Sequence, residues 1–156
     1  KKRELDRSEV LLQELIKEIV SSIKPKADQE NINLKIDFPP NNISLYIDKM
    51  AVLAAFSSIL ENAVDACVSK NKKGEISFVT QIKDPDIIFS IRDNGKGMDE
   101  NKKDKIFDLF FSDKGNKGTG LGLFIASRSI KQHGGSIKVT SQLNQYTQFI
   151  VTLPLK

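Results

Sequence analysis

The sequence predicts an α+β domain, a two-layer sandwich in which one mixed sheet of about five strands is covered on one face by about three helices. Three observations predict it. Apolar residues recur at helical spacing in three segments, and strict alternation marks several others. The predicted strands are segregated from the helices instead of alternating with them one by one. The length of 156 residues is that of a single domain able to bury most of its apolar surface.

The first elements are a helix and two short strands. Residues 9–23 carry an apolar stripe at helical spacing. Pro25 is expected to end or kink this helix, because a proline deep in a helix costs about 3 kcal/mol. Residues 32–38 alternate like a half-buried strand that two prolines stop, and residues 44–47 are a short second strand.

A long helix and a hairpin follow. Asp48 is the expected N-cap of a helix over residues 49–69, because its side chain can accept a backbone hydrogen bond in the first turn. Residues 74–83 and 86–93 are predicted strands joined by a turn at Pro85.

The last third begins irregularly. Residues 94–120 are rich in Gly, Lys and Asp, so no continuous element is expected there. Residues 121–132 are predicted to be a helix that ends at Gly134, a natural left-handed C-cap. Residues 136–142 and 148–154 close the sheet as an antiparallel pair.

The net charge, the cysteine count and the apolar content of the sequence limit the kinds of ligand and location that we expect. The net charge of +4 suits a polyanionic ligand, but no long basic run predicts a nucleic-acid partner. The single cysteine, Cys67, excludes an internal disulfide and fits a reducing, cytoplasmic compartment. No uninterrupted apolar run approaches the roughly 18 residues that a membrane span needs, so no membrane insertion by this chain is expected.

The helix predicted over 49–69 has two distinct faces. A polar stripe of Ser58, Asn62 and Asp65 recurs at positions i, i+4 and i+7. A lone Asn on a helix usually faces solvent. Glycine-rich segments elsewhere in the chain favour a second interpretation, in which Asn62 is a ligand of Mg²⁺ beside a phosphate. The opposite face is expected to be buried and carries Leu53, Phe56, Leu60, Ala63 and Cys67.

The predicted strand 86–93 ends in a turn with the sequence DNGKGM. An ordinary turn is one interpretation, whereas an EF-hand loop is excluded because Gly95 occupies a ligand position. The functional interpretation makes Asp93 a buried acceptor for the exocyclic amine of a base. Gly95 and Gly97 would then let a flat base lie against the main chain.

A second glycine-rich segment, GTGLGL, opens the helix predicted over 121–132. Free N–H groups and the helix dipole favour phosphate at such a terminus. A P-loop is excluded because Leu121 follows the second glycine, and a dinucleotide fingerprint is excluded because Leu123 occupies the place of its last glycine. A flexible linker is disfavoured by the leucines.

Three phenylalanines and two lysines lie between the glycine-rich segments. Phe107, Phe110 and Phe111 could form a small core cluster. Flanked by glycines and lysines, they are more typical of a mobile lid whose Lys114 or Lys117 reaches phosphates.

These segments together resemble a known family. In chain order, ENAVDA, DNGKGM, FDLFFSDK and GTGLGL are similar to the N, first-glycine, F and second-glycine boxes of sensor histidine kinases, over roughly residues 8–155. The resemblance implies the Bergerat ATP-binding fold shared with gyrase-like, Hsp90-like and MutL-like ATPases, with ATP and Mg²⁺ as cofactors. It also implies that Asn62 coordinates Mg²⁺, that Asp93 binds the adenine amine and that Thr147 joins the hydrogen bonding around adenine. The implied site residues are Asn62, Asp65, Asp93, Gly95, Gly97, Met98, Phe107, Lys114, Lys117, Gly118, Thr119, Gly120, Leu121, Gly122 and Thr147.

The sequence also departs from the family pattern. Leu109 stands where a proline is common, and Tyr146 stands where a glycine often precedes the threonine. Ser58 lies one turn before Asn62, where related ATPases carry a glutamate as general base. A hydroxyl cannot take a proton from water at neutral pH. We therefore expect weak hydrolysis and γ-phosphate transfer to an imidazole, a nucleophile that needs little activation.

The resemblance implies partners outside this chain. Residues 9–156 would be the catalytic domain, and residues 1–8 the remnant of a dimerisation helix or a linker. The acceptor histidine would lie on a separate dimerisation domain of a parent protein that could be membrane-anchored, with a response regulator downstream. His133 is the one histidine of this chain and is expected to cap or pack. Two alternatives are a nucleotide-sensing module without kinase activity and, less favoured, a gyrase-type ATPase clamp.

Overall fold

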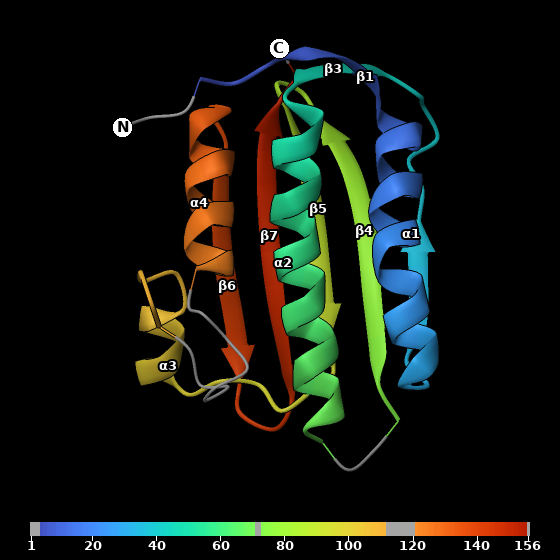
Figure 1. Cartoon of the computed structure of the whole chain (residues 1–156). Coiled ribbons are helices and arrows are strands. Elements are labelled where there is room, and N and C mark those ends of the chain that lie inside the picture. Colours follow the sequence, from blue (N-terminus) through green and yellow to red (C-terminus); the bar gives the residue numbers. More distant parts are fainter. Residues whose placement is uncertain (1–3, 71–72, 112–120, 156) are drawn as a thin grey trace.

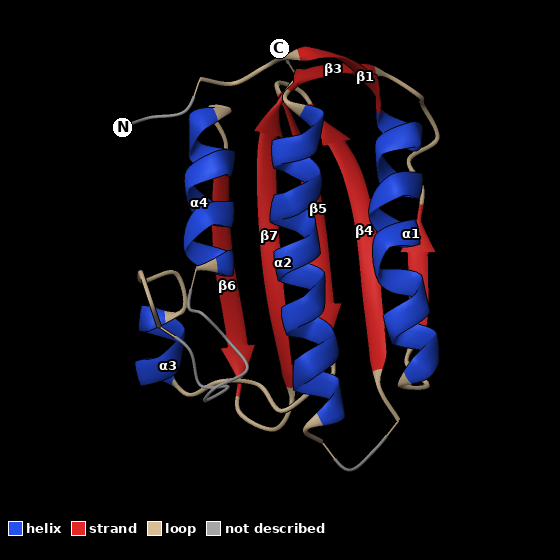
Figure 2. Cartoon of the chain, viewed as in Figure 1, coloured by secondary structure: helices blue, strands red, loops and turns tan. Residues whose placement is uncertain are grey.

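A computed structural model describes residues 4–70, 73–111 and 121–155. Its largest unit is a five-stranded sheet in the order β2-β4-β5-β7-β6. Three long helices, α1, α2 and α4, lie side by side on one face of this sheet (Figures 1 and 2). The predicted two-layer α+β architecture is therefore confirmed. In chain order the elements are β1 (Ser8–Leu11), α1 (Leu12–Gln29), β2 (Asn33–Asp37), β3 (Ser44–Ile47), α2 (Lys49–Val68), β4 (Glu75–Lys83), β5 (Asp86–Asp93), α3 (Glu100–Lys105), α4 (Gly122–Gln132), β6 (Ser136–Gln142) and β7 (Tyr146–Pro154).

The sheet is mixed because one of its pairings is parallel. β2 runs parallel to β4, whereas β4-β5, β5-β7 and β7-β6 are antiparallel. The hairpin predicted around Pro85 and the closing pair β6-β7 are both present. This order puts β5 and β7 in the middle of the sheet, directly behind α2 (Figure 1).

Helix α2 occupies the centre of the helical layer and carries the largest share of the core. The ring of Phe56 packs edge-on against that of Phe89, with 4.9 Å between the ring centroids. It is tilted against the ring of Phe78, with 5.8 Å between the centroids. By length and composition α2 could cross a membrane, with mean hydropathy 1.5. Half of that stretch is buried within the described part of the domain, so its apolar character is that of a core helix.

Helix α1 does not end at Pro25, although an end there was one of the two outcomes predicted for this residue. The helix starts at Leu12, three residues later than expected, and continues through Pro25 to Gln29. Pro25 is exposed, and so is Ser21, whose carbonyl loses its helical hydrogen bond, so water can replace the missing donor. Burial of Ile23 and Ala27 holds the turns on either side against the core, which offsets the cost of the proline.

The N-terminal residues form a strand that was not predicted from the sequence. Residues 8–11, expected in part to open the first helix, are β1 and pair antiparallel with β3 in a separate two-stranded sheet. β3 therefore does not belong to the main sheet. Residues 4–7 contain no helix, and the Asp6 N–H donates to Asp48 Oδ2 across 3.0 Å.

Helix ends follow the predicted capping. Asp48 Oδ1 accepts from the Ala51 N–H at 3.1 Å and caps α2. Gly134 adopts φ +80°, and the N–H groups of Gly134 and Gly135 return to the last carbonyls of α4. Within the segment predicted to be irregular, residues 100–105 form the short helix α3, capped by Asp99.

Candidate functional site

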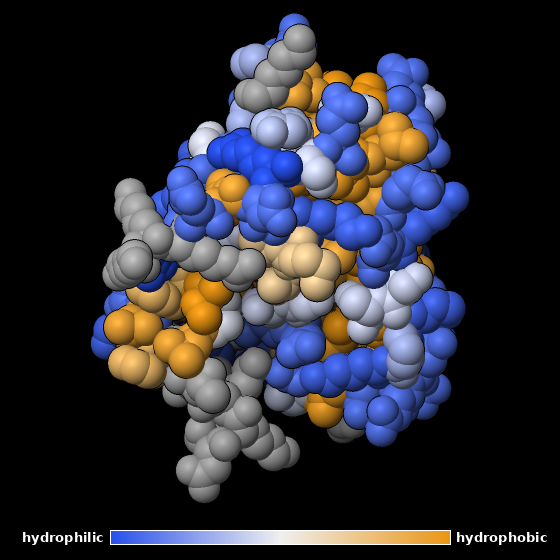
Figure 3. All heavy atoms as spheres, turned by 45° about the horizontal axis from the view of Figure 1, so that its top comes forward, coloured by the Kyte–Doolittle hydropathy of each residue, from blue (hydrophilic) through white to orange (hydrophobic). Residues whose placement is uncertain are grey.

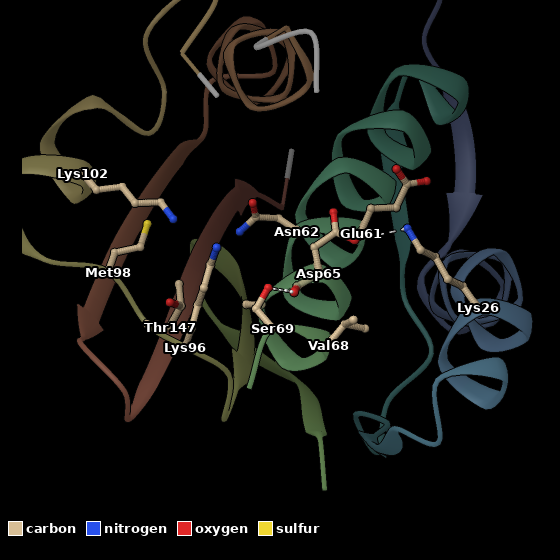
Figure 4. A pocket seen from close by; sticks show the side chains of 12 residues that line it. Lys26, Glu61, Asn62, Asp65, Val68, Ser69, Lys96, Met98, Lys102 and Thr147 are labelled. Carbon is tan, nitrogen blue, oxygen red and sulfur yellow. Dashed lines mark hydrogen bonds and ion pairs between the residues drawn. The ribbon is translucent and has the colours of Figure 1, made fainter. Parts of the chain in front are cut away.

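A cavity of about 530 Å³ opens beside the C-terminal half of α2 (Figure 4). Its walls are α2, the loop after β5, the start of α3 and the first residues of β7. This volume is within the range of about 300–1,000 Å³ that is usual for small-molecule sites. The lining residues are Lys26, Glu61, Asn62, Asp65, Ala66, Val68, Ser69, Lys96, Gly97, Met98, Lys102 and Thr147.

Helix α2 brings two of the three predicted polar residues to this cavity. Asn62 is half-buried and points into the cavity, and Asp65 lies one turn further along (Figure 4). The carboxylate of Asp65 forms an ion pair with Lys26 of α1 at 3.5 Å. Ser58 does not line the cavity. It lies instead under the start of α4, where its Oγ would be 3.2 Å from a Cβ placed on Gly122.

Asp93 is a buried carboxylate at the end of β5. It is 1% exposed, and its Oδ1 accepts from the Gly95 N–H at 2.8 Å. Burial raises the pKa of Asp93 from 3.8 to about 6, although the Gly95 N–H and the charges of Arg92 and Lys70 oppose this rise. Asp93 is paired across the sheet with Thr147, which lines the cavity. Asp93 is not itself a lining residue, so its carboxylate lies behind the cavity wall, next to Thr147.

A hydroxyl network fixes the floor of the cavity. Ser141 Oγ accepts from the Met98 N–H at 2.8 Å, donates to the Tyr146 carbonyl at 2.7 Å and lies 2.8 Å from Thr147 Oγ1. Thr147 and Met98 are both buried. Ser141 was not among the predicted residues, and it faces the site only because β6 and β7 pair in this register.

The two glycines of DNGKGM have a packing role in the structure. A Cβ on Gly95 would overlap the carbonyl group of Ala66 on α2. Gly97 has φ +67°, and a Cβ there would overlap the carbonyl oxygen of Gln142. Both positions thus let the loop after β5 pass between α2 and the β6-β7 turn. This requirement exists whether or not a base lies against them.

Replacing Gly97 with Ala should destabilise the domain by about 2 kcal/mol or more, because the methyl group meets a backbone carbonyl and φ is positive. Chemical denaturation measures this change. Gly134→Ala is a matched control with positive φ, since a methyl group there would lie 3.7 Å from its nearest neighbour, Pro154. A smaller loss at Gly97 than at Gly134 would contradict the packing role.

Two further residues hold this loop and were not predicted. Lys70 Nζ donates to the carbonyls of Asn94 and Asn144, joining the end of α2 to both loops around the cavity. Asn94 Oδ1 accepts from the Glu75 N–H at 2.8 Å, and its Nδ2 donates to the Lys73 carbonyl. The motif containing Asn94 was visible in the sequence, but nothing indicated that its amide closes the loop onto β4.

The segment after α3 is described only in part. Phe107 is partly buried and packs edge-on against Phe149, with 6.0 Å between the ring centroids, so this one phenylalanine packs against the core. The cluster of all three phenylalanines, one of the two interpretations, does not form, because Phe110 is exposed. Leu109 and Phe110 are exposed. Figure 3 shows several apolar patches among the hydrophilic surface of one face of the molecule. Gly122 begins α4 and Leu121 precedes it. Lys114, Lys117, Gly118, Thr119 and Gly120 lie outside the described residues.

His133 is a buried packing residue, 3% exposed. Its Nδ1 lies 2.7 Å from the Ser129 carbonyl, which can only accept, so Nδ1 carries the proton. Its Nε2 accepts from the Asp48 N–H at 3.1 Å. Both ring nitrogens are therefore engaged, in agreement with the capping or packing role predicted for this histidine.

The side chains around the cavity suit a metal ion that takes few ligands from the protein. Among the described residues no three His, Cys, Asp or Glu side chains gather as metal ligands. A cation here would thus depend on oxygen atoms of a ligand. Mg²⁺ is commonly held in this way, by one or two protein oxygens and by phosphates, and the amide oxygen of Asn62 fits that role.

Comparison with known proteins decides the family. The family model of histidine kinase-, DNA gyrase B-, and HSP90-like ATPases matches residues 47–156. The chain belongs to this ATPase family. The sensor proteins RprX of Bacteroides fragilis and SrrB of Staphylococcus aureus are each 32% identical to it, over 99% and 84% of this chain respectively. The chain spans 30% of the length of RprX and 23% of that of SrrB.

Within the ATPase family, the fold is that of histidine kinase catalytic domains. The catalytic domain of histidine kinase ThkA, in a nucleotide-free form, superposes with a TM-score of 0.84 at 27% identity, over 97% of each chain. ThkA in complex with the response regulator protein TrrA superposes at 0.82 and 25% identity, over 100% of this chain and 44% of that one. The resemblance to sensor histidine kinases is confirmed.

Proposed function

We propose that this ATPase-family domain binds Mg-ATP in the cavity beside α2 and supplies the γ-phosphate to a histidine on a separate dimerisation domain. One observation carries the proposal. The half-buried amide of Asn62 lines the cavity from α2, and the buried carboxylate Asp93 of β5 is the cross-strand partner of Thr147, which lines the same cavity. A purine amine and a metal-bound phosphate are the two chemical groups that such an acceptor and such an amide oxygen suit.

Each residue has a defined task in this proposal. Asp93 accepts a hydrogen bond from the exocyclic amine of adenine, and Thr147 orders the hydroxyls beside it. A guanine would present a carbonyl oxygen to the Asp93 carboxylate, and the repulsion between the two acceptors favours ATP over GTP. Asn62 is the residue that would hold Mg²⁺, which disperses charge on the phosphates when it is bound.

The residue one helical turn before Asn62 favours phosphate transfer to an imidazole over hydrolysis of ATP. The side chain one turn earlier is Ser58, which packs under α4 and cannot act as a general base on water. Transfer to an imidazole requires less activation. A ring nitrogen forms a bond to the γ-phosphorus, the bond to the β–γ bridging oxygen breaks, and ADP leaves. The acceptor must come from outside, because His133 is buried with both nitrogens engaged.

The partners belong to the same proposal. ThkA, a structural relative, forms a complex with a response regulator protein. We infer that this domain works in the cytoplasm beside a histidine-bearing dimerisation domain, with a response regulator as the next phosphate acceptor.

Calorimetric titration tests the nucleotide assignment. We expect ATP to bind at least about tenfold more tightly than GTP, and Mg²⁺ to strengthen ATP binding but not adenosine binding. The domain is then mixed with a histidine-bearing dimerisation domain and γ-labelled ATP. Label on the added domain supports the kinase. Tight ATP binding with no transfer would favour the alternative, a nucleotide-sensing module, and equal affinity for ATP and GTP would contradict the role of Asp93.

A further inference from the structure

Two lysines from different elements point at the predicted metal ligand. Figure 4 shows the side chains of Lys96, in the loop after β5, and Lys102, on α3, directed toward Asn62 from the opposite side of the cavity. Neither belongs to the residues that the family resemblance implies. We propose that Lys96 and Lys102 bind the phosphate groups of the nucleotide. This inference rests on the proposed function.

The charge distribution in the cavity supports this assignment. Its two lining carboxylates, Glu61 and Asp65, both belong to α2, and Asp65 forms an ion pair with Lys26 of α1. The acidic side chains and Lys26 thus gather at one wall. Lys96 and Lys102 gather at the other, next to Asn62 (Figure 4). A Mg²⁺-bound triphosphate keeps a net negative charge, so ammonium groups beside the metal ligand complement it.

The backbone holds Lys96 firmly in this direction. Its N–H donates to the Ala66 carbonyl at 3.0 Å, and its own carbonyl accepts from the Asn144 N–H at 2.6 Å. The glycines on both sides fit against α2 and the β6-β7 turn. The backbone from which the Lys96 side chain extends is therefore fixed before a phosphate binds.

Lys102 reaches the cavity from the capped first turn of α3. Asp99 Oδ1 accepts from the Lys102 N–H at 2.8 Å, and buried Ile106 fastens the end of the helix. Met98, four residues earlier, lines the same cavity. Binding of phosphate by Lys102 would therefore link α3 to the nucleotide. Lys105 of the same helix is exposed and does not line the cavity.

The test compares ATP with adenosine, which lacks phosphates. We expect Lys96→Gln and Lys102→Gln each to weaken ATP binding about tenfold and to leave adenosine binding within about twofold. Lys102→Arg should retain most of the ATP affinity. Lys105→Gln is the matched control, with the same charge change on α3 and no expected loss. Calorimetry at constant ionic strength measures all four variants.

The outcomes separate this inference from the proposed function. If the unsubstituted domain binds no ATP, both fail. If it binds ATP and the two glutamine variants keep full affinity, only the lysine assignment is overturned. Equal losses for ATP and adenosine would also overturn it, because they would indicate a structural role. A loss confined to ATP, absent in Lys105→Gln, supports it.

Discussion

Asp93→Asn is expected to weaken ATP binding at least about a hundredfold and, at the same time, to stabilise the ligand-free domain. The amide cannot accept from both the Gly95 N–H and the adenine amine as the carboxylate can, and its N–H₂ group opposes the amine donor. Loss of binding together with a gain in stability excludes unfolding as the cause.

The sign of the stability change follows from the pKa of Asp93, which burial raises from 3.8 to about 6. The folded domain binds this proton more tightly than the unfolded chain does. Above about pH 6 the buried charge therefore costs stability, on the order of 3 kcal/mol, and the cost fades as the pH falls toward 4. Asn carries no charge, so the variant should gain most at pH 8 and little at pH 4.

Urea denaturation at pH 8 and pH 4 and calorimetry with ATP measure these two effects. Asp86→Asn, at the opposite end of the same strand, is the control for removing one negative charge. Unchanged ATP affinity in Asp93→Asn would refute the adenine assignment, and a stability gain equal at both pH values would refute the electrostatic explanation.

Asn62→Ala should separate nucleotide binding from phosphate transfer. We expect adenosine to bind almost normally, the gain in ATP affinity from Mg²⁺ to disappear, and transfer to an added dimerisation domain to fall at least about a hundredfold. Asn62→Asp keeps an oxygen ligand and should retain Mg²⁺-dependent binding. Asn101→Ala, on an exposed position of α3, is the control. Transfer that survives in Asn62→Ala would show that another group holds the metal.

The sequence predicted those parts of the fold that depend on local pattern. Periodicity located α2 and α4, and capping residues such as Asp48 and Gly134 marked their ends. Alternation located β4 to β7. For the site, the turn DNGKGM and the polar stripe of α2 predicted Asp93 and Asn62, and the family resemblance implied Thr147. Asn62 and Thr147 line the same cavity, and Asp93 is the cross-strand partner of Thr147.

The remainder depends on contacts between distant segments. Helix α1 continues beyond Pro25 because Pro25 lies on the exposed face of the helix while Ala27 is buried. The sequence around a proline does not reveal which face of a helix the proline occupies. β1 exists because β3 lies beside it. Ser141 contributes to the site because of the register between β6 and β7, and Lys70 contributes because of the way the loops pack. Neither residue lies in a recognisable motif. Lys102 lines the cavity because residues 100–105 form α3, within a segment that the sequence predicted to be irregular.

The engagement of His133 has a practical consequence for any reconstitution with labelled nucleotide. Both imidazole nitrogens of His133 form hydrogen bonds that connect α4 to the start of α2. Nε2 accepts from the Asp48 N–H, and Nδ1 donates to the Ser129 carbonyl. We therefore expect the isolated domain to take up no acid-labile label on its own histidine, so that such label in a mixture reports on the added protein. Candidate acceptors can be screened one after another against the same preparation without correcting for a background from the donor.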